Sequence, residues 1–447
     1  MGKKENDLRN SAPNDSSGKC KDNVAMPENY KELLKPLWIS VFVDILGFTI
    51  ILPFIPFFAM EYNATTLQTG LLISSNAIFG FVFSNVFGSL SDKYGRKPLI
   101  LIAQGGTLVS FLILSFSNSL GMLFLARIVD GIFGGQFPIS KAIIGDVVPK
   151  EERGRQMTNI GLAFALASLV GPAAGAFLSR FGIIGPGLLA VSLSAFTIGF
   201  TALKLKETNP KVLKDAKKPV YIREELPNGE TAPVDGLEIL KKPKTYLSWL
   251  PASTKHLIAE YSVVSLIGRI FETTLSIYAF MRLGLDEEGL GTIFTIMAIF
   301  QIVFRGLAFA KIAKSLGDVK TSMTGLIIMP IALSSLMLVT QQWHLITVVV
   351  LYSLGRSLSN GILNGLLSRS VNQRNQGKIN GISSSIDNLA QIFAPIIGTA
   401  LLGAAIANLY GLVLVILACL SAIMHIRVFK FSFRDDEEKC DKEENRE

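Results

Sequence analysis

Long apolar runs separated by short polar segments fill the chain between residues 37 and 428. A helix of about 20 apolar residues spans the hydrocarbon core of a bilayer, so we count twelve candidate spans in two sets of six. They are predicted at residues 37–60, 69–91, 98–117, 119–145, 156–179, 183–204, 257–281, 289–310, 321–340, 343–367, 379–403 and 407–428. The pattern predicts an all-α membrane protein with two six-helix bundles.

Polar segments flank and divide the two bundles. No apolar segment opens the chain, so no cleavable signal peptide is expected. We predict a flexible N-terminal tail, a first bundle, a polar linker, a second bundle and an acidic C-terminal tail, at residues 1–36, 37–204, 205–256, 257–428 and 429–447.

Lysine and arginine gather in the loops after the second, fourth, eighth and tenth spans and in the linker. The loops on the other side offer only Arg180 and Arg282. Cytoplasmic loops of membrane proteins are enriched in these residues. The basic side, with both termini, is therefore predicted to be cytoplasmic, in a protein of the cell membrane.

Composition narrows the classes of protein that fit. Charged residues make up 17% of the chain and hydrophobic residues 49%, whereas a soluble domain carries about 25% charged residues. The net charge of +8 is then a signal of topology and does not indicate a nucleic-acid partner. Three cysteines, three dispersed histidines and the lack of a phosphate-binding loop give no sign of a disulfide framework, metal site or nucleotide. We expect no enzyme and no cofactor.

The two halves repeat each other in sequence. Gly95 aligns with Gly317 at an offset of 222 residues, and Pro172 aligns with Pro395 at an offset of 223. A parallel repeat of six plus six helices places the substrate site where the halves meet, near the bilayer midplane.

A glycine-rich, charged motif follows the second span. It runs Gly88-Ser-Leu-Ser-Asp92-Lys-Tyr-Gly95-Arg96-Lys. It resembles the signature between helices two and three of the major facilitator superfamily. The resemblance implies a conformational latch in which the acid faces the start of helix eleven. It also implies that Arg96 pairs with an acid at the end of helix four, the place of Asp146. A basic loop that only fixes topology is the alternative.

The second half keeps a degraded copy of this motif. Gly306, Lys314, Gly317 and Lys320 remain, but Lys314 stands where the first half has its acid. We therefore do not expect a second equivalent latch.

Arg127 and Asp130 lie within the fourth span. The segment resembles the family's helix-four motif, whose buried arginine is linked to proton transfer in antiporters. A charge inside a span is costly and is a functional hypothesis by default. Asp130 either neutralises Arg127 at a spacing of three residues or carries a proton beside it.

Helices one and five carry two further resemblances to twelve-helix drug–proton antiporters of the tetracycline-efflux type. One is the segment from Asp44 to Pro56 in the first span. The other is Gly171-Pro172-Ala-Ala-Gly175 in the fifth, where Ala176 replaces a second glycine. Packing of small residues would explain the second motif equally well.

Other charges inside spans are candidates for the transport cavity. Helix rise places Asp44, Asp130, Arg356 and Asp387 at a similar depth. Arg269 and Glu272, three residues apart, form an internal ion pair or bind substrate. Glu260, Lys141 and Arg305 lie near the cytoplasmic face, where long side chains reach the interface.

The resemblance implies a monomeric secondary transporter that moves small organic solutes by alternating access. Its partners are the substrate, a proton and the lipid bilayer. The expected activity is proton-coupled efflux of drug-like or amphiphilic compounds, with Asp44, Arg127 and Asp130 as the coupling residues. An importer or uniporter of a sugar, amino acid or other metabolite remains an alternative, as does a non-transporting receptor or scaffold.

Overall fold

The computed structural model describes residues 30–209, 250–371, 375–404 and 407–444. Most of the predicted N-terminal tail and of the linker, together with the last three residues, lies outside them. Within the described residues every regular element is a helix.

The first half contains eight helices. They are α1 (Tyr30–Ile51), α2 (Ile55–Glu61), α3 (Thr66–Tyr94), α4 (Arg96–Ser115), α5 (Leu120–Ile132), α6 (Gln136–Val147), α7 (Lys150–Ser179) and α8 (Ile184–Lys204). Pro53 interrupts the first span between α1 and α2, because proline cannot donate a backbone hydrogen bond. Gly134 and Gly135 stand at the break between α5 and α6.

The second half follows the same plan. Its elements are α12 (Ala252–Leu283), α13 (Glu287–Val303), the π-helix η1 (Phe304–Phe309), α14 (Ala310–Leu316), α15 (Asp318–Ser334), the 3-10 turn η2 (Ser335–Leu338), α16 (Gln342–Arg369), α17 (Gln376–Gly403) and α18 (Ala407–Glu444).

Eleven helical segments among the described residues are long and apolar enough to cross a membrane. The fifth predicted span lies in α7, whose apolar part, Leu166–Ser179, is shorter. All 30 residues of α7 give about 45 Å of helix, enough to cross a bilayer. The prediction of an all-α, multi-pass membrane protein is confirmed.

Some helices extend beyond the predicted boundaries. α1 begins before residue 37 because Tyr30, Leu34 and Leu37 repeat at helical spacing and are buried in the core. α18 continues into residues 429–444, which the sequence assigned to a tail. That stretch contains no proline or glycine to end the helix.

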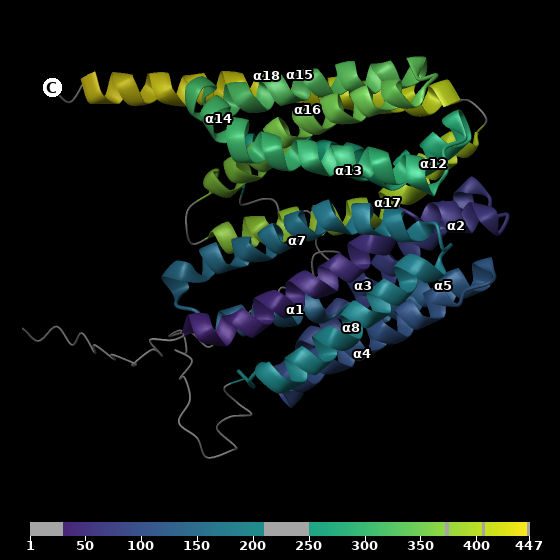
Figure 1. Ribbon diagram of the computed structural model, residues 1–447. Coiled ribbons are helices and arrows are strands. Elements are labelled where there is room, and N and C mark those ends of the chain that lie inside the picture. Colours follow the sequence, from purple (N-terminus) through teal and green to yellow (C-terminus); the bar gives the residue numbers. More distant parts are fainter. Residues whose placement is uncertain (1–29, 210–249, 372–374, 405–406, 445–447) are drawn as a thin grey trace, which may run out of the picture.

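The two halves meet mainly at one end of the molecule. Figure 1 shows α1–α8 as the lower group and α12–α18 as the upper group, with α7 and α17 lying where the groups meet. We call the end that carries the α3–α4 and α14–α15 turns the loop end, and the end that carries the α2–α3 turn the opposite end. The halves meet toward the opposite end, where the larger buried apolar cluster joins Ile50, Phe54 and Phe58 of the first half to Leu275 and Tyr278 of the second.

Hydrogen bonds between the halves lie toward the opposite end as well. Ser74 Oγ of α3 donates to the carbonyl of Ile392 of α17 at 2.6 Å. Ser276 Oγ of α12 donates to the carbonyl of Pro53 at 2.7 Å. Backbone groups of one half thus bind side chains of the other.

Small residues allow this close approach. α7 packs on α13 so tightly that a Cβ built on Gly291 would lie 1.8 Å from Cβ of Ala176. Ala176 is the position where the helix-five motif usually has a second glycine. The glycine that this contact requires is on the facing helix.

We expect Gly291→Ala to destabilise the packed halves, because two methyl groups cannot share this space. Overpacking of this kind costs about 1–3 kcal/mol. The double variant Ala176→Gly/Gly291→Ala restores the complementary pair and should recover most of the loss. Thermal unfolding of the purified variants in detergent measures both effects. Equal melting temperatures for the single and double variants would contradict this packing.

Candidate functional site

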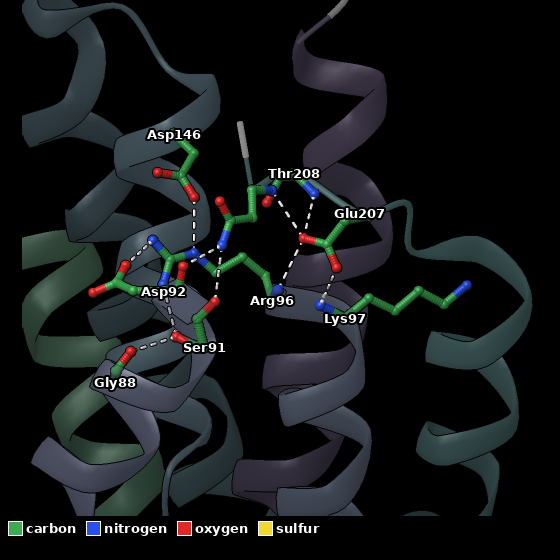
Figure 2. Close-up of polar contacts among 9 residues, drawn as sticks. Gly88, Ser91, Asp92, Arg96, Lys97, Asp146, Glu207 and Thr208 are labelled. Carbon is green, nitrogen blue, oxygen red and sulfur yellow. Dashed lines mark hydrogen bonds and ion pairs between the residues drawn. The ribbon is translucent and has the colours of Figure 1, made fainter. Parts of the chain in front are cut away.

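Arg96 is the centre of a polar cluster at the loop end (Figure 2). Its Nε lies 2.9 Å from Asp146 Oδ2, and its Nη2 lies 2.7 Å from Asp92 Oδ1. Nη1 donates to Ser91 Oγ at 2.7 Å. Gly95 makes the turn from α3 to α4 with a φ of +106°, a conformation that favours glycine. The structure thus brings together Asp92, Arg96 and Asp146, as the sequence motif predicts.

Two parts of the motif differ from expectation. A glycine in such a motif can let two helices approach closely, but a Cβ on Gly88 would meet no atom within 4 Å in this conformation. Gly88 instead accepts a hydrogen bond from Ser91 Oγ through its carbonyl. The Asp92 side chain is 63% exposed and pairs within its own half.

Glu207, which the sequence analysis missed, caps the start of α4. Its Oε1 accepts the backbone N–H of Arg96 at 2.8 Å, and its Oε2 accepts that of Lys97 at 3.0 Å. The same Oε1 accepts the backbone N–H groups of Thr208 and Asn209. A carboxylate at a helix N-terminus satisfies free N–H groups and faces the positive end of the dipole.

The chain after α8 is therefore part of the cluster. Asn209 Nδ2 donates to the carbonyls of Ser91 and Asp92 at 3.0 and 2.9 Å. Lys97 Nζ donates to the carbonyl of Ala202 at 2.7 Å. The first residues of the predicted linker thus hold the α3–α4 turn in place.

Arg127 and Asp130 form a buried ion pair inside the first half. Arg127 Nη1 lies 3.1 Å from Asp130 Oδ2, and Arg127 is 2% exposed. Asn76 of α3 donates to the same Oδ2 at 2.9 Å, another contact that the sequence analysis missed. The Arg127 guanidinium also lies 5.5 Å from the ring centre of Phe48 in α1. Such cation–ring contacts are attractive.

Asp44 lies in a separate polar group formed by α1, α4 and α8. Gln104 Nε2 donates to Asp44 Oδ2 at 3.0 Å and to Ser40 Oγ at 2.8 Å. Ser40 and Thr201 share a hydrogen bond of 2.9 Å. Asp44 Oδ1 is enclosed without a hydrogen-bond partner. Among the described residues no cation forms an ion pair with it.

The second half holds its own charged cluster. Arg356 Nη2 of α16 lies 3.2 Å from Glu272 Oε1 of α12. Arg269 is more distant, with Nη1 3.9 Å from Glu272 Oε2. Gly268 makes room for this arrangement, because a Cβ there would lie 1.2 Å from Arg356 Nη1. Both Arg269 and Glu272 remain about one-third exposed.

Asp387 of α17 is bound by hydroxyl groups of α12. Tyr261 donates to its Oδ2 at 2.9 Å and Ser265 to its Oδ1 at 2.6 Å. These bonds tie α12 to α17. The four candidate cavity charges therefore gather on three helices of one half.

Glu260 is not interfacial, so that expectation is wrong. It is fully buried, and its Oε1 lies 2.7 Å from His425 Nδ1 of α18. His425 Nε2 also shares a hydrogen bond of 2.7 Å with Ser322 of α15. Burial of a carboxylate needs such partners. Lys141 is exposed, whereas the side chain of Arg305 lies outside the described part.

The glycines of the helix-five motif pack α7 against α1. A Cβ on Gly171 would lie 2.2 Å from Thr49 Oγ1, and one on Gly175 would lie 2.2 Å from the carbonyl oxygen of Ile50. Pro172 is buried between them. The geometry accounts for the motif through close helix packing.

Comparison with known proteins identifies the family. The sequence model of the Major Facilitator Superfamily matches residues 37–286 and 261–447. The chain belongs to the Major Facilitator Superfamily. It is therefore a multi-pass membrane transporter by family and fold. Among the described residues, no group of three histidine, cysteine or acidic side chains lies close enough to hold a metal ion.

Relatives within this family include resistance proteins. The class H tetracycline resistance protein of Pasteurella multocida is 26% identical over 402 residues, covering 89% of this chain and 96% of the relative. The class B tetracycline resistance protein of Escherichia coli is 24% identical and covers 79% of this chain and 84% of the relative. The multi-drug resistance efflux pump PmrA of Streptococcus pneumoniae is 31% identical over 196 residues, covering 43% of this chain and 49% of the pump.

Solved structures show the same fold. The human organic anion transporter MFSD10 superposes with a TM-score of 0.64 at 20% identity, covering 89% of this chain and all of that one. A bacterial homologue of the human lysosomal transporter Spinster, inward-facing and occupied, gives a TM-score of 0.64 at 14% identity. This match covers 90% of this chain and 98% of that one.

We expect Glu207→Ala to destabilise the loop end, because the first N–H groups of α4 lose their acceptor. Loss of a helix cap costs about 0.5–2 kcal/mol. Glu207→Gln keeps one acceptor oxygen and should lose less. Thermal unfolding measures the series, with the exposed neighbour Lys206→Ala as the control. An unchanged melting temperature in Glu207→Ala would contradict the capping role.

We expect Asp130→Asn to destabilise the first half, because Arg127 then stays buried without a counter-ion. Breaking a buried pair in this way costs about 3–5 kcal/mol. The double variant Arg127→Gln/Asp130→Asn removes both charges and should lose less. Thermal unfolding again gives the comparison. A fully stable Asp130→Asn would show that Asp130 is already uncharged, as a proton-carrying residue would be.

Proposed function

We propose that this protein exports drug-like or amphiphilic compounds in exchange for protons, by alternating access. Similarity to tetracycline resistance proteins along most of both chains supports the class of cargo. The partial similarity to a multi-drug efflux pump agrees with it. The protein would act as a monomer in the cell membrane, with its loop end in the cytoplasm, where lysine and arginine are most frequent.

The surroundings of Asp44 carry the proposal of proton coupling. Each of the other acids in the polar groups has compensation: Asp130 has Arg127, Glu272 has Arg356, Glu260 has His425 and Asp387 has two hydroxyl donors. Asp44 has the Gln104 amide on one oxygen, no partner on the other and, among the described residues, no basic side chain; Glu260 also has one unpartnered oxygen but keeps His425 on the other. An ionised carboxylate without a counter-charge is costly in such a place. A bound proton removes that cost.

Movement of α1 would then release the proton. Asp44 is enclosed by α4 and α8 on one side of α1. Phe48, one helical turn further along α1, contacts Arg127. A shift of α1 that admits water to Asp44 therefore also changes the surroundings of the Arg127–Asp130 pair. In this proposal the pair senses the position of α1, while Asp44 holds the proton.

The arrangement of the halves supports opening at the loop end. Their contacts lie toward the opposite end, through Ser74, Ser276 and the Ala176–Gly291 pair. At the loop end Asp92 is largely exposed. With that end in the cytoplasm, cargo would enter from inside the cell and contact the partly exposed Arg269 and Glu272.

The test is uptake of tetracycline into proteoliposomes with an imposed pH gradient, acid inside. We expect wild-type protein in the inverted orientation to accumulate the compound against its gradient. Asp44→Asn keeps an acceptor for Gln104 but cannot exchange a proton. It should lose nearly all uphill uptake while retaining exchange of labelled for unlabelled compound, because exchange needs no net proton movement.

Glu61→Gln provides the matched control, since it removes an exposed carboxyl at the end of α2. It should behave as the wild type. Uphill uptake by Asp44→Asn at the wild-type rate would refute Asp44 as the proton carrier. Wild-type uptake that ignores the pH gradient and only equilibrates the compound would refute proton coupling and favour a uniporter. Absence of any solute flux would favour the receptor or scaffold alternative.

A further inference from the structure

The turn between α14 and α15 has the same backbone form as the turn between α3 and α4. Gly317 has φ +75° and ψ 161°, and Gly95 has φ +106° and ψ 156°. Each glycine ends one helix and precedes the first residue of the next. The second half therefore preserves the shape of the loop, although its motif is degraded.

An ion pair follows this glycine in both halves. In the first half Arg96, at the start of α4, pairs with Asp146, near the end of α6. In the second half Asp318, at the start of α15, pairs with Arg369, at the end of α16. The offsets of 222 and 223 residues that relate the halves place Asp318 on Arg96 and Arg369 on Asp146. The two pairs are equivalent in position and opposite in sign.

The third charge of the motif is reversed as well. The same offset places Lys314 on Asp92, and each lies four residues before the first charge of the next helix. The attraction between two charges depends on the product of their signs, so reversing both signs of a pair leaves the attraction unchanged. Lys314, which departs from the motif, is thus one of three positions at which the second half carries the charge opposite to that of the first half.

We propose that Lys314, Asp318 and Arg369 form a charge-reversed second latch at the loop end. Asp318 and Arg369 act as positioning residues, because they tie α15 to α16 and fix the turn that carries Lys314. The expectation that the second half has no equivalent latch is thereby replaced. The proposal rests on the alternating-access motion and is independent of the cargo and of proton coupling.

The neighbouring helices indicate what Lys314 meets. α13 packs on α7 at the Ala176–Gly291 contact, and both helical paths run from there to the loop end. Lys314 stands near the end of the α13–α14 path and is exposed. Glu152 stands in the first turn of α7. In Figure 1, α14 and the start of α7 lie at the same side of the molecule, in different halves. When the loop end closes, a cation on α14 approaches an acid on α7.

The test measures closure of the loop end directly. Spin labels are placed at the exposed positions Lys93 and Ser315, in a variant with the native cysteines Cys20, Cys419 and Cys440 replaced by serine. Distances between the labels are recorded in lipid nanodiscs. We expect a long-distance population and a short-distance one. Asp318→Arg, Arg369→Asp and Lys314→Glu should each lower the ratio of short to long distances about two- to fivefold, as expected for partly exposed charges.

The double reversal Asp318→Arg/Arg369→Asp is the decisive arm. It restores the attraction between positions 318 and 369, with the signs that Arg96 and Asp146 have in the first half, and should restore the wild-type ratio. A merely stabilising pair would change the melting temperature and leave the ratio unchanged. Lys320→Asp, an exposed reversal on the same helix outside the set, should also leave it unchanged.

Three outcomes would overturn the second latch. They are an unchanged ratio in Lys314→Glu, an unchanged ratio in both single reversals of the pair, and failure of the double reversal to restore the ratio in a folded protein. A wild-type protein that never shows the short distance would refute the alternating-access motion itself. The failure of the latch and the failure of the proposed function therefore give different results.

Discussion

The hydrocarbon interior of a bilayer offers no water to a charged side chain, so every charge inside a span must find its partner in the protein. This constraint arranges the polar residues of both halves. Arg127 is held by Asp130, Arg356 by Glu272, and Glu260 by His425. Glu260 keeps one oxygen unpartnered but has His425 on the other, whereas Asp44 has one unpartnered oxygen and, among the described residues, no basic side chain paired to it. A group that is balanced only when it binds a proton is suited to proton transport.

The two ends of the molecule are held by different kinds of contact, close packing of small residues at one and charged clusters at the other. Toward the opposite end the halves pack through small side chains and backbone carbonyls, as at Ala176–Gly291 and Ser276–Pro53. At the loop end, charged clusters hold the turns of each half, around Arg96 and around Asp318. Tight apolar packing and adjustable charge contacts at different ends are what a rocking motion of two bundles requires.

The sequence was sufficient to predict the helices and one charged cluster, but not the contacts between residues on distant helices. Hydrophobic run lengths revealed the helices, and the spacing of Asp92, Gly95 and Arg96 marked one cluster. The roles of Glu207 and Asn76 could not be predicted, because the contact of Glu207 with Arg96 and that of Asn76 with Asp130 form only when segments far apart in the sequence pack together. Glu260 was misread for the same reason, since depth along a helix does not reveal which face meets His425. The charge reversal at Asp318 became visible only once its contact with Arg369 was known.

Proton release on binding tests the central claim most directly. Tetracycline is added to purified protein in weakly buffered detergent that contains a pH-sensitive dye, while calorimetry follows binding. Exchange of cargo for a proton at Asp44 requires reciprocal linkage between the two ligands. The account predicts that the wild type releases protons as it binds and that Asp44→Asn binds without release. Binding by the wild type with no release, or equal release by Asp44→Asn, would contradict it.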